Sequence, residues 1–225
     1  MLPTIQPGSD EHQDLRHRRI TGSKIDIVMN GTYVGLNSLS KLMHGEPVFY
    51  GVGKNTPSQL KRGIEWEPRA RNDLWNSNPE LTVTQPGFLT PEDFGVDLGM
   101  ITEWLGYSPD GVLQDLRDIM ELLEIKTQNE EVWAKYSARG IVNPHNMPQM
   151  QLGLLITGWD SCWYRAFNPN PEGDQKYFDV KVLADRAYHK TMIAKCEEFV
   201  AIHAANEEFK PPISSNADLS ALQGL

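Results

Sequence analysis

The chain has 225 residues, of which 40% are hydrophobic, and this size and composition fit one soluble globular domain. Its 21 Lys and Arg residues against 30 Asp and Glu residues give a net charge of −9, which excludes a protein that coats DNA with a uniformly basic surface. The two cysteines, Cys162 and Cys196, are too few and too far apart for a cysteine zinc site or an iron–sulfur cluster. They indicate a reducing, cytoplasmic setting without structural disulfides. We expect neither a secretory signal in residues 1–5 nor a membrane span, because no apolar run is long enough.

The charge is unevenly distributed along the chain. Residues 1–72 carry 10 basic and 7 acidic side chains, whereas residues 73–133 carry 2 basic and 13 acidic side chains. The acidity therefore belongs to the middle third of the chain. Two interpretations stay open, a solvated acidic face and a metal site lined by carboxylates.

The first third of the chain predicts short helices separated by capping residues and glycines. They are expected over residues 10–19, 24–30, 36–44 and 56–76. In the last of these, Thr56 is a cap and Pro57 lies in the first turn. Pro68 lies inside the same helix, so we expect a kink or a break near Glu67.

From residue 81 the pattern becomes typical of strands. The alternation at the start of residues 81–88 predicts a half-buried strand, and residues 98–105 are a second strand candidate. Residues 108–111, Ser-Pro-Asp-Gly, are typical of a turn after that strand. Residues 118–127 are nearly continuously apolar, which predicts a central strand covered on both faces.

The rest of the chain alternates between helix and strand. We expect helices over 130–139, 147–157 and 184–208, and a pair of strands over 159–167 and 177–183. Together the elements predict an α/β (α+β) fold with a mixed central β-sheet flanked by helices. We expect one domain over residues 1–209 and a flexible tail over residues 210–225.

Three ionisable residues of the acidic middle have an arrangement that suits chemistry. Glu124 and Lys126 are two apart on a predicted strand and therefore point to the same face, with 13 residues between Asp110 and Glu124. Burying such charges is costly, so the pair either lies on an exposed face or lines a site. Two carboxylates from separate segments are enough to anchor Mg²⁺, which assists hydrolysis of phosphodiesters. Lys126 would then orient or deprotonate the attacking water, or neutralise charge on the phosphorane.

Five segments in a fixed order carry a resemblance to a known family. They are Leu-Arg-His-Arg-Arg-Ile-Thr-Gly-Ser-Lys (15–24), Gly-Ile-Glu-Trp-Glu-Pro-Arg-Ala-Arg (63–71), Tyr-Ser-Pro-Asp-Gly (107–111), Leu-Leu-Glu-Ile-Lys (122–126) and Met-Pro-Gln-Met-Gln (147–151). In this order and spacing the chain resembles the phage-type alkaline exonucleases, the bacteriophage lambda exonuclease or YqaJ-like viral recombinase family of the PD-(D/E)xK nuclease superfamily. The resemblance runs from about Arg16 to Phe167.

This resemblance implies a restriction-endonuclease-like core and a Mg²⁺-dependent 5′→3′ exonuclease. Such an enzyme degrades one strand of linear double-stranded DNA and leaves 3′ single-stranded tails for phage or prophage recombination by single-strand annealing. The implied metal centre holds two ions, and Mn²⁺ can replace Mg²⁺. The implied partners are DNA with 5′-phosphorylated ends, a single-strand annealing protein and two further copies of the chain in a homotrimeric ring.

The resemblance also implies roles for residues of the metal centre. Asp110 and Glu124 are the expected metal ligands, together with the backbone carbonyl of Ile125. Lys126 is the expected catalytic lysine. Glu67 is expected to support the metal through a water molecule.

Further residues are implied around this centre. Gln149 is the catalytic-site glutamine expected beside the lysine. Arg16, Ser23 and Ser108 are expected to bind the terminal 5′-phosphate, for which a guanidinium and two hydroxyls are suitable partners. Leu60 is a candidate wedge at the DNA end, with packing in the core as the alternative.

Some assignments stay open in the sequence. Glu65 is an alternative to Glu67 at the metal centre, and Arg18 and Arg19 are alternatives to Arg16.

One segment and the function itself also stay open. Residues 30–58 align poorly with the family, so any further phosphate-binding residue there is unassigned. Besides the exonuclease, the chain could be a structure-specific DNA endonuclease on the same fold or a non-catalytic recombination scaffold. Intact Asp110, Glu124 and Lys126 argue against the scaffold.

Overall fold

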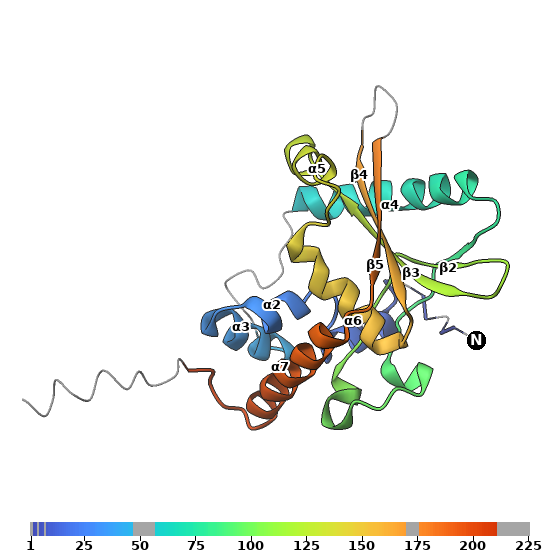
Figure 1. The fold of residues 1–225 in the computed structure, drawn as a ribbon. Helices are drawn as coiled ribbons and strands as arrows, with labels where there is room; N and C mark the ends of the chain where they lie inside the picture. Colours follow the sequence, from blue (N-terminus) through green and yellow to red (C-terminus); the bar gives the residue numbers. More distant parts are fainter. Residues whose placement is uncertain (1, 4, 7, 47–56, 170–175, 211–225) are drawn as a thin grey trace, which may run out of the picture.

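The computed structural model describes residues 2–3, 5–6, 8–46, 57–169 and 176–210. Its centre is a five-stranded sheet in the order β1-β2-β3-β4-β5 (Figure 1). The strands are β1 (Thr82–Thr84), β2 (Gly111–Gln114), β3 (Met120–Thr127), β4 (Ser161–Asn168) and β5 (Lys176–Leu183). Neighbouring strands are antiparallel except β3 and β4, which run parallel. The mixed sheet with its flanking helices confirms the predicted α/β (α+β) class.

Helices cover both faces of this sheet. The α-helices are α1 (Asp10–His17), α2 (Ile25–Asn30), α3 (Tyr33–Met43), α4 (Pro57–Ser77), α5 (Glu130–Ser137), α6 (Met147–Thr157) and α7 (Arg186–Ala204). The 3₁₀ helices are η1 (Pro91–Phe94), η2 (Gly99–Trp104) and η3 (Pro144–Asn146). In Figure 1, α4 crosses behind the strands, while α2, α6 and α7 gather on the opposite side. The crossover from β3 to its parallel neighbour β4 contains α5 and α6, as a parallel connection requires.

Two hydrophobic clusters, one on each face, fix the sheet between these layers. The alternation of side chains along β3 sends Leu122 into the larger cluster with α6 and α7, and Leu123 and Ile125 into the smaller cluster with α4. All three side chains have no exposed surface. Strand β3 is therefore a central strand covered on both faces, as its apolar sequence predicts.

The strand predicted over residues 98–105 is wrong, because most of this segment forms the 3₁₀ helix η2. Ile101 and Leu105 are buried but Glu103 between them is exposed, which does not fit a strand, because residues two apart on a strand share one face. Gly99 has a φ of 62°, a left-handed conformation that starts the turn. Asp110 consequently does not follow a strand but directly precedes the short strand β2, which the sequence did not predict.

Of the kink or break predicted near Glu67, the break is wrong, because α4 continues through Pro68 to Ser77. A proline inside a helix deprives the carbonyl four residues earlier of its partner. That residue is Ile64, which is 78% exposed, so water can satisfy the carbonyl. The uninterrupted helix keeps Glu67 and Arg71 on consecutive turns.

Other expectations concern the cysteines, the membrane and the chain ends. Cys162 and Cys196 are buried free thiols in the described structure. Within the described residues, no helix combines the length and apolar character needed to cross a bilayer. Residues 211–225 of the predicted tail lie outside the described part of the chain, as do residues 47–56 of the poorly aligned segment.

Candidate active site

The β2–β3 hairpin brings two predicted metal ligands together. Gly111 pairs with Leu123, so continuing this register by one residue sets Asp110 opposite Glu124. The backbone N–H of Ile125 donates a hydrogen bond of 2.7 Å to Oδ2 of Asp110. This bond ties the carboxylate at the start of one strand to the backbone of the next.

Glu124 is a fully buried carboxylate with two partners. Its Oε1 accepts a hydrogen bond from the Lys126 ammonium, and its Oε2 accepts one of 2.7 Å from the Tyr107 hydroxyl. Glu124 has no exposed surface, whereas the Lys126 side chain is 29% exposed. The prediction that Glu124 and Lys126 face the same way is confirmed, and the burial of Glu124 shows that the pair does not lie on an exposed face.

The ionisable groups here influence one another strongly. Burial raises the pKa of Asp110 well above its usual value, the negative charge of Glu124 raises it further, and Lys126 opposes the shift. Burial alone would lower the pKa of Lys126, but Glu124 and Asp110 raise it above its usual value, so the ammonium stays charged. The site therefore has an excess of buried negative charge for which a cation is the natural complement.

Helix α4 adds two side chains to this region. Arg71 donates a hydrogen bond of 2.7 Å from Nε to the backbone carbonyl of Asp110. Glu67, one turn earlier, is half-buried, and burial raises its pKa above the usual value. Glu65 is exposed, whereas Glu67 lines the same pocket as Asp110, so the structure favours Glu67 over its alternative.

A pocket of about 250 Å³ joins this carboxylate group to the predicted phosphate-binding group. Its wall contains residues from the first helix, the turn before α2, helix α4, the β1–η1 loop, the Ser-Pro-Asp turn and α6. The predicted site residues that line it are Arg16, Ser23, Glu67, Ser108, Asp110 and Gln149. Residues from distant parts of the sequence therefore face one space.

The residues of the predicted phosphate-binding group are linked to one another by hydrogen bonds. Arg16 donates from Nη1 to Ser108 Oγ (3.1 Å) and from Nη2 to Ser23 Oγ (3.3 Å). Arg18 and Arg19 line a different pocket with Trp104, so the structure favours Arg16 over both alternatives. A guanidinium between two hydroxyls presents several donors to an anion.

The side chain of Lys24 holds the backbone at the end of α1, close to Arg16 and Ser23. The Lys24 ammonium donates hydrogen bonds to the backbone carbonyls of Arg16 (2.7 Å), His17 (3.1 Å) and Arg19 (2.9 Å) at the end of α1. A cation on the last carbonyls of a helix is favourable. Lys24 thereby fixes the backbone on which the Arg16 side chain depends.

Two further predicted residues have different outcomes. Gln149 lies against Gly22, where an added Cβ would come within 2.8 Å of its Cγ, so this close approach requires a glycine. Leu60 belongs to α4, but its side chain lies outside the described part of the structure, so its wedge role stays a prediction.

Sequence reasoning missed three residues of the site, namely His12, Arg71 and Tyr107. His12 lies one helical turn before Arg16 and lines the pocket, and Arg71 lies one turn after Glu67. This spacing of four residues was the available signal, because it places side chains on one helix face. Tyr107 directly precedes Ser108, but nothing in the sequence indicates that its hydroxyl would meet Glu124.

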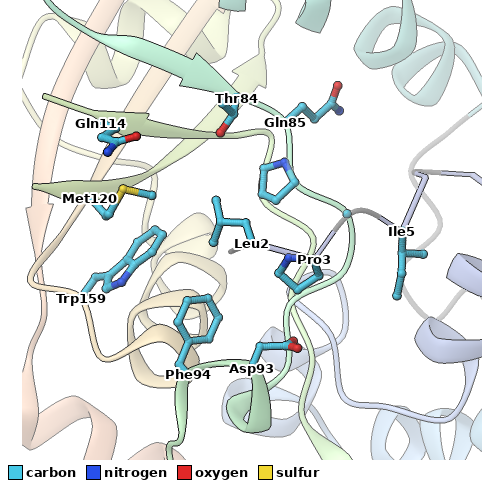
Figure 2. A pocket seen from close by; sticks show the side chains of 12 residues that line it. Leu2, Pro3, Ile5, Thr84, Gln85, Asp93, Phe94, Gln114, Met120 and Trp159 are labelled. Carbon is cyan, nitrogen blue, oxygen red and sulfur yellow. The ribbon is translucent and has the colours of Figure 1, made fainter. Parts of the chain in front are cut away.

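A larger and more apolar pocket of about 690 Å³ lies beside the candidate site. Figure 2 shows the side chains of Leu2, Phe94, Met120 and Trp159 directed into it. It shares residues 85–87 with the smaller pocket, so this short segment separates the two spaces. The six predicted site residues named above line the smaller pocket and not this one.

The oxygen atoms at and beside Asp110 are suitable ligands for a hard cation that keeps some of its water molecules. Within the described residues, no three His, Cys, Asp or Glu side chains are grouped so as to hold a metal ion by themselves. Mg²⁺ does not require such a group, because one or two carboxylates with waters are enough. The carboxylates of Asp110 and Glu124 and the carbonyl of Ile125 are oxygen donors of this kind, and the excess negative charge around Asp110 favours a dication.

Comparison with known proteins gives the same picture of the fold. The family model for the YqaJ-like viral recombinase domain matches residues 11–160. The crystal structure of the alkaline exonuclease LHK-Exo from Laribacter hongkongensis is similar, with a TM-score of 0.70 at 22% identity, over 96% of this chain and 100% of that one. Its complex with dAMP gives a TM-score of 0.71 at 23% identity, over 88% and 94% of the two chains.

A phage-related exonuclease from Haemophilus somnus 129PT is more distant. It has a TM-score of 0.61 at 11% identity, over 86% of this chain and 98% of its own. No curated protein sequence matches the chain. At these identities the solved structures show a shared fold.

Proposed function

The chain belongs to the YqaJ-like viral recombinase family, and from this premise we propose that it is a Mg²⁺-dependent 5′→3′ exonuclease of linear double-stranded DNA. The observation that supports the proposal most is that one pocket is lined both by Asp110 and Glu67 and by the phosphate-binding candidates Arg16, Ser23 and Ser108. A metal-binding group suits phosphodiester cleavage, and an adjoining anion-binding group suits a DNA end. The alkaline exonuclease activity named for the similar structures agrees with this proposal.

Asp110, Glu124 and the Ile125 carbonyl would hold Mg²⁺, with Glu67 acting through a water molecule. When bound, the metal would neutralise a phosphate oxygen and lower the pKa of a coordinated water. Mn²⁺ would replace Mg²⁺ because it accepts similar oxygen ligands. A second ion between the same carboxylates is part of the proposal, since paired metals stabilise both the attacking and the leaving oxygen.

Lys126 would orient the attacking water and neutralise charge that develops on the phosphate. An ammonium suits both of these roles, since it donates hydrogen bonds and carries a positive charge. Glu124 fixes the ammonium through their ion pair. Gln149 would add an amide donor from the α6 side of the pocket.

Arg16, Ser23 and Ser108 would hold the terminal 5′-phosphate and thereby set the polarity of degradation. With the 5′ end held in the same pocket as the metal ligands, the bond within reach is the one that follows the first nucleotide. Cleavage there releases a 5′-mononucleotide and leaves a 3′ single-stranded tail for an annealing protein. The dAMP bound in the LHK-Exo complex is a nucleotide of this product class.

We propose a homotrimeric ring around the DNA as the working assembly, on the strength of the family resemblance. A ring would keep the enzyme on its substrate by enclosing it. Light scattering of the purified protein should give the mass of three chains, and the mass of one chain at working concentrations would exclude the ring.

The proposal is tested with linear duplex DNA labelled at one end, with and without Mg²⁺, beside a covalently closed circle. We expect release of labelled mononucleotide from the 5′ end only when Mg²⁺ is present, and an intact circle. Cleavage of the closed circle would instead support the structure-specific endonuclease. Binding without cleavage under every metal condition would support the recombination scaffold.

Arg16→Ala tests the phosphate-binding group. We expect degradation of 5′-phosphorylated ends to fall at least tenfold, because a charge-assisted hydrogen bond contributes about 1.5–3 kcal/mol. Ends with a 5′-hydroxyl should be affected less. Arg18→Ala is the matched control, because Arg18 is exposed and lines the other pocket. An equal loss on both kinds of end would contradict the assigned role of Arg16.

A further inference from the structure

His12 is a pocket residue to which neither the sequence nor the family resemblance gave a role. It lies in the first turn of α1 and is only 6% exposed, with its ring edge-on to Phe88. It lines the smaller pocket together with Arg16 and Ser108. A buried imidazole in an anion-binding pocket needs both ring nitrogens accounted for.

The backbone fixes which nitrogen of His12 carries the proton. The N–H of Gly8 donates a hydrogen bond of 3.2 Å to Nδ1, so in the neutral ring the proton is on Nε2. Nε2 lies 3.0 Å from Ser108 Oγ and therefore donates to it. Burial and the nearby Arg16 guanidinium lower the pKa of His12, which keeps the ring neutral at pH 7 and above.

The hydroxyl of Ser108 consequently has only one direction left for its own proton. A hydroxyl has one proton and two lone pairs. Ser108 Oγ accepts from His12 Nε2 and from Arg16 Nη1 at 3.1 Å, which occupies both lone pairs. Its O–H is then free to donate to whatever occupies the pocket.

We infer that His12 is a positioning residue that fixes the Ser108 hydroxyl as a hydrogen-bond donor, and that it thereby sets the preference for 5′-phosphorylated over 5′-hydroxyl DNA ends. The inference deepens the proposed function and rests on it. A terminal phosphate dianion only accepts hydrogen bonds, so a fixed donor suits it. A terminal hydroxyl both donates and accepts, so it gains less from a fixed donor.

Two amide substitutions separate the functions of the two ring nitrogens. In His12→Gln the amide nitrogen takes the place of Nε2 and can still donate to Ser108. In His12→Asn the shorter amide takes the place of Nδ1 and can still accept from Gly8, but it does not reach Ser108. Both variants replace an imidazole by a neutral amide, so they form a matched pair. His17→Gln, at an exposed position of the same helix, is the surface control.

The quantity to measure is the ratio of kcat/KM on 5′-phosphorylated and 5′-hydroxyl ends of the same duplex. We expect His12→Asn to lower this ratio about tenfold, the cost of one charge-assisted donor, and His12→Gln to keep it within about threefold of the wild type. In a Ser108→Ala background the two His12 variants should have equal ratios, because the hydroxyl through which His12 acts is gone. Unequal ratios in that background would overturn the inference.

A ratio that His12→Asn leaves unchanged, while the wild type prefers phosphorylated ends, overturns the inference and leaves the proposed exonuclease intact. A wild-type enzyme that degrades DNA without any end preference overturns both the phosphate-binding group and the inference. The tautomer provides a test on the unmodified protein, in case His12→Asn does not fold. Nitrogen-15 NMR of the histidine rings at pH 8 should show His12 protonated on Nε2, and protonation on Nδ1 would overturn the inference.

Discussion

Lys126 lies near the end of β3, directly after the four buried residues 122–125 of that strand. The carboxylate that holds it, Glu124, is fully buried, so their ion pair is shielded from water more than a surface pair would be. Tyr107 holds the second carboxylate oxygen. The charge and the position of the ammonium are therefore both set before any DNA arrives, which is the condition for electrostatic stabilisation of a transition state.

Lys126→Ala tests this residue. We expect kcat for DNA cleavage to fall at least about 10²-fold, because one preorganised donor to developing charge is lost. DNA binding, measured by fluorescence anisotropy, should change little. Lys190→Ala, at an exposed position of α7, should retain activity. Cleavage by Lys126→Ala at the wild-type rate would remove Lys126 from the proposed mechanism.

At the scale of elements, helix α6 is fitted closely to the segment that carries the site. A Cβ at Gly153 would lie 2.6 Å from the Tyr107 ring and 2.7 Å from Leu122, closer than side-chain atoms approach. The glycine thus lets α6 pack directly on the tyrosine that holds Glu124. Packing of the helix and geometry of the site are coupled at this point.

Gly153→Ala should therefore destabilise the protein by about 1–3 kcal/mol through overpacking, despite the higher helix propensity of alanine. Gly35→Ala is the matched control. Gly35 also lies in a helix, but its Cβ would meet nothing nearer than 3.6 Å, so we expect a gain of up to about 1 kcal/mol. Urea denaturation of both variants measures the difference, and equal stabilities would contradict the close fit at Gly153.

Elements with strong local signals could be predicted from the sequence, and those that depend on tertiary contacts could not. The helices over residues 10–19 and 130–139 have side-chain caps at Ser9 and Asn129, and the structure confirms both elements with shorter ends. Strand β2 has four residues and exists because β1 and β3 pair with it on either side. A pattern within four residues is too short to predict this.

The same distinction applies to the site. Residues of the five motifs could be assigned by resemblance, and the structure brings six of the predicted residues to one pocket. The choice between Glu65 and Glu67 could not be made from the sequence, because it depends on which face of α4 is turned towards the pocket. The hydrogen bond that links His12 to Ser108 joins positions 96 residues apart, which no local pattern indicates.

For the molecule as a whole, the buried charge of Asp110 lowers the free energy of unfolding when no cation is bound. The raised pKa of Asp110 means that the folded protein binds a proton there more tightly than the unfolded chain does. Stability of the metal-free protein therefore increases as the pH falls through this raised pKa, and the gain is complete near the ordinary pKa of about 4. A cation that neutralises the carboxylate should supply a similar gain at higher pH.

Asp110→Asn should consequently melt at a higher temperature than the metal-free wild type at pH 8, by about 2–4 °C for each kcal/mol gained. The amide removes the charge, and its oxygen can still accept from Ile125. The difference in Tm should shrink as the pH falls, because Asp110 of the wild type then becomes protonated. Calorimetry at several pH values measures it, and a difference that grows towards low pH would contradict the raised pKa.

The same samples test the metal ligand. Mg²⁺ should raise the Tm of the wild type, because a ligand that binds only the folded state stabilises it, and it should raise the Tm of Asp110→Asn less. Equal stabilisation of both proteins would show that Mg²⁺ binds elsewhere.

The β2–β3 hairpin also has a consequence for how the chain folds. Its two strands are joined by residues 115–119, where Asp115 accepts from the backbone N–H groups of Arg117 and Ile119. A hairpin of this kind closes within microseconds, whereas the parallel pairing of β3 with β4 must await the crossover through α5 and α6. We therefore expect Asp110 and Glu124 to meet early in folding, and Glu67 and Gln149 to join them only when distant helices dock. A partly folded chain would therefore already have the two carboxylates side by side, before the pocket for DNA has formed.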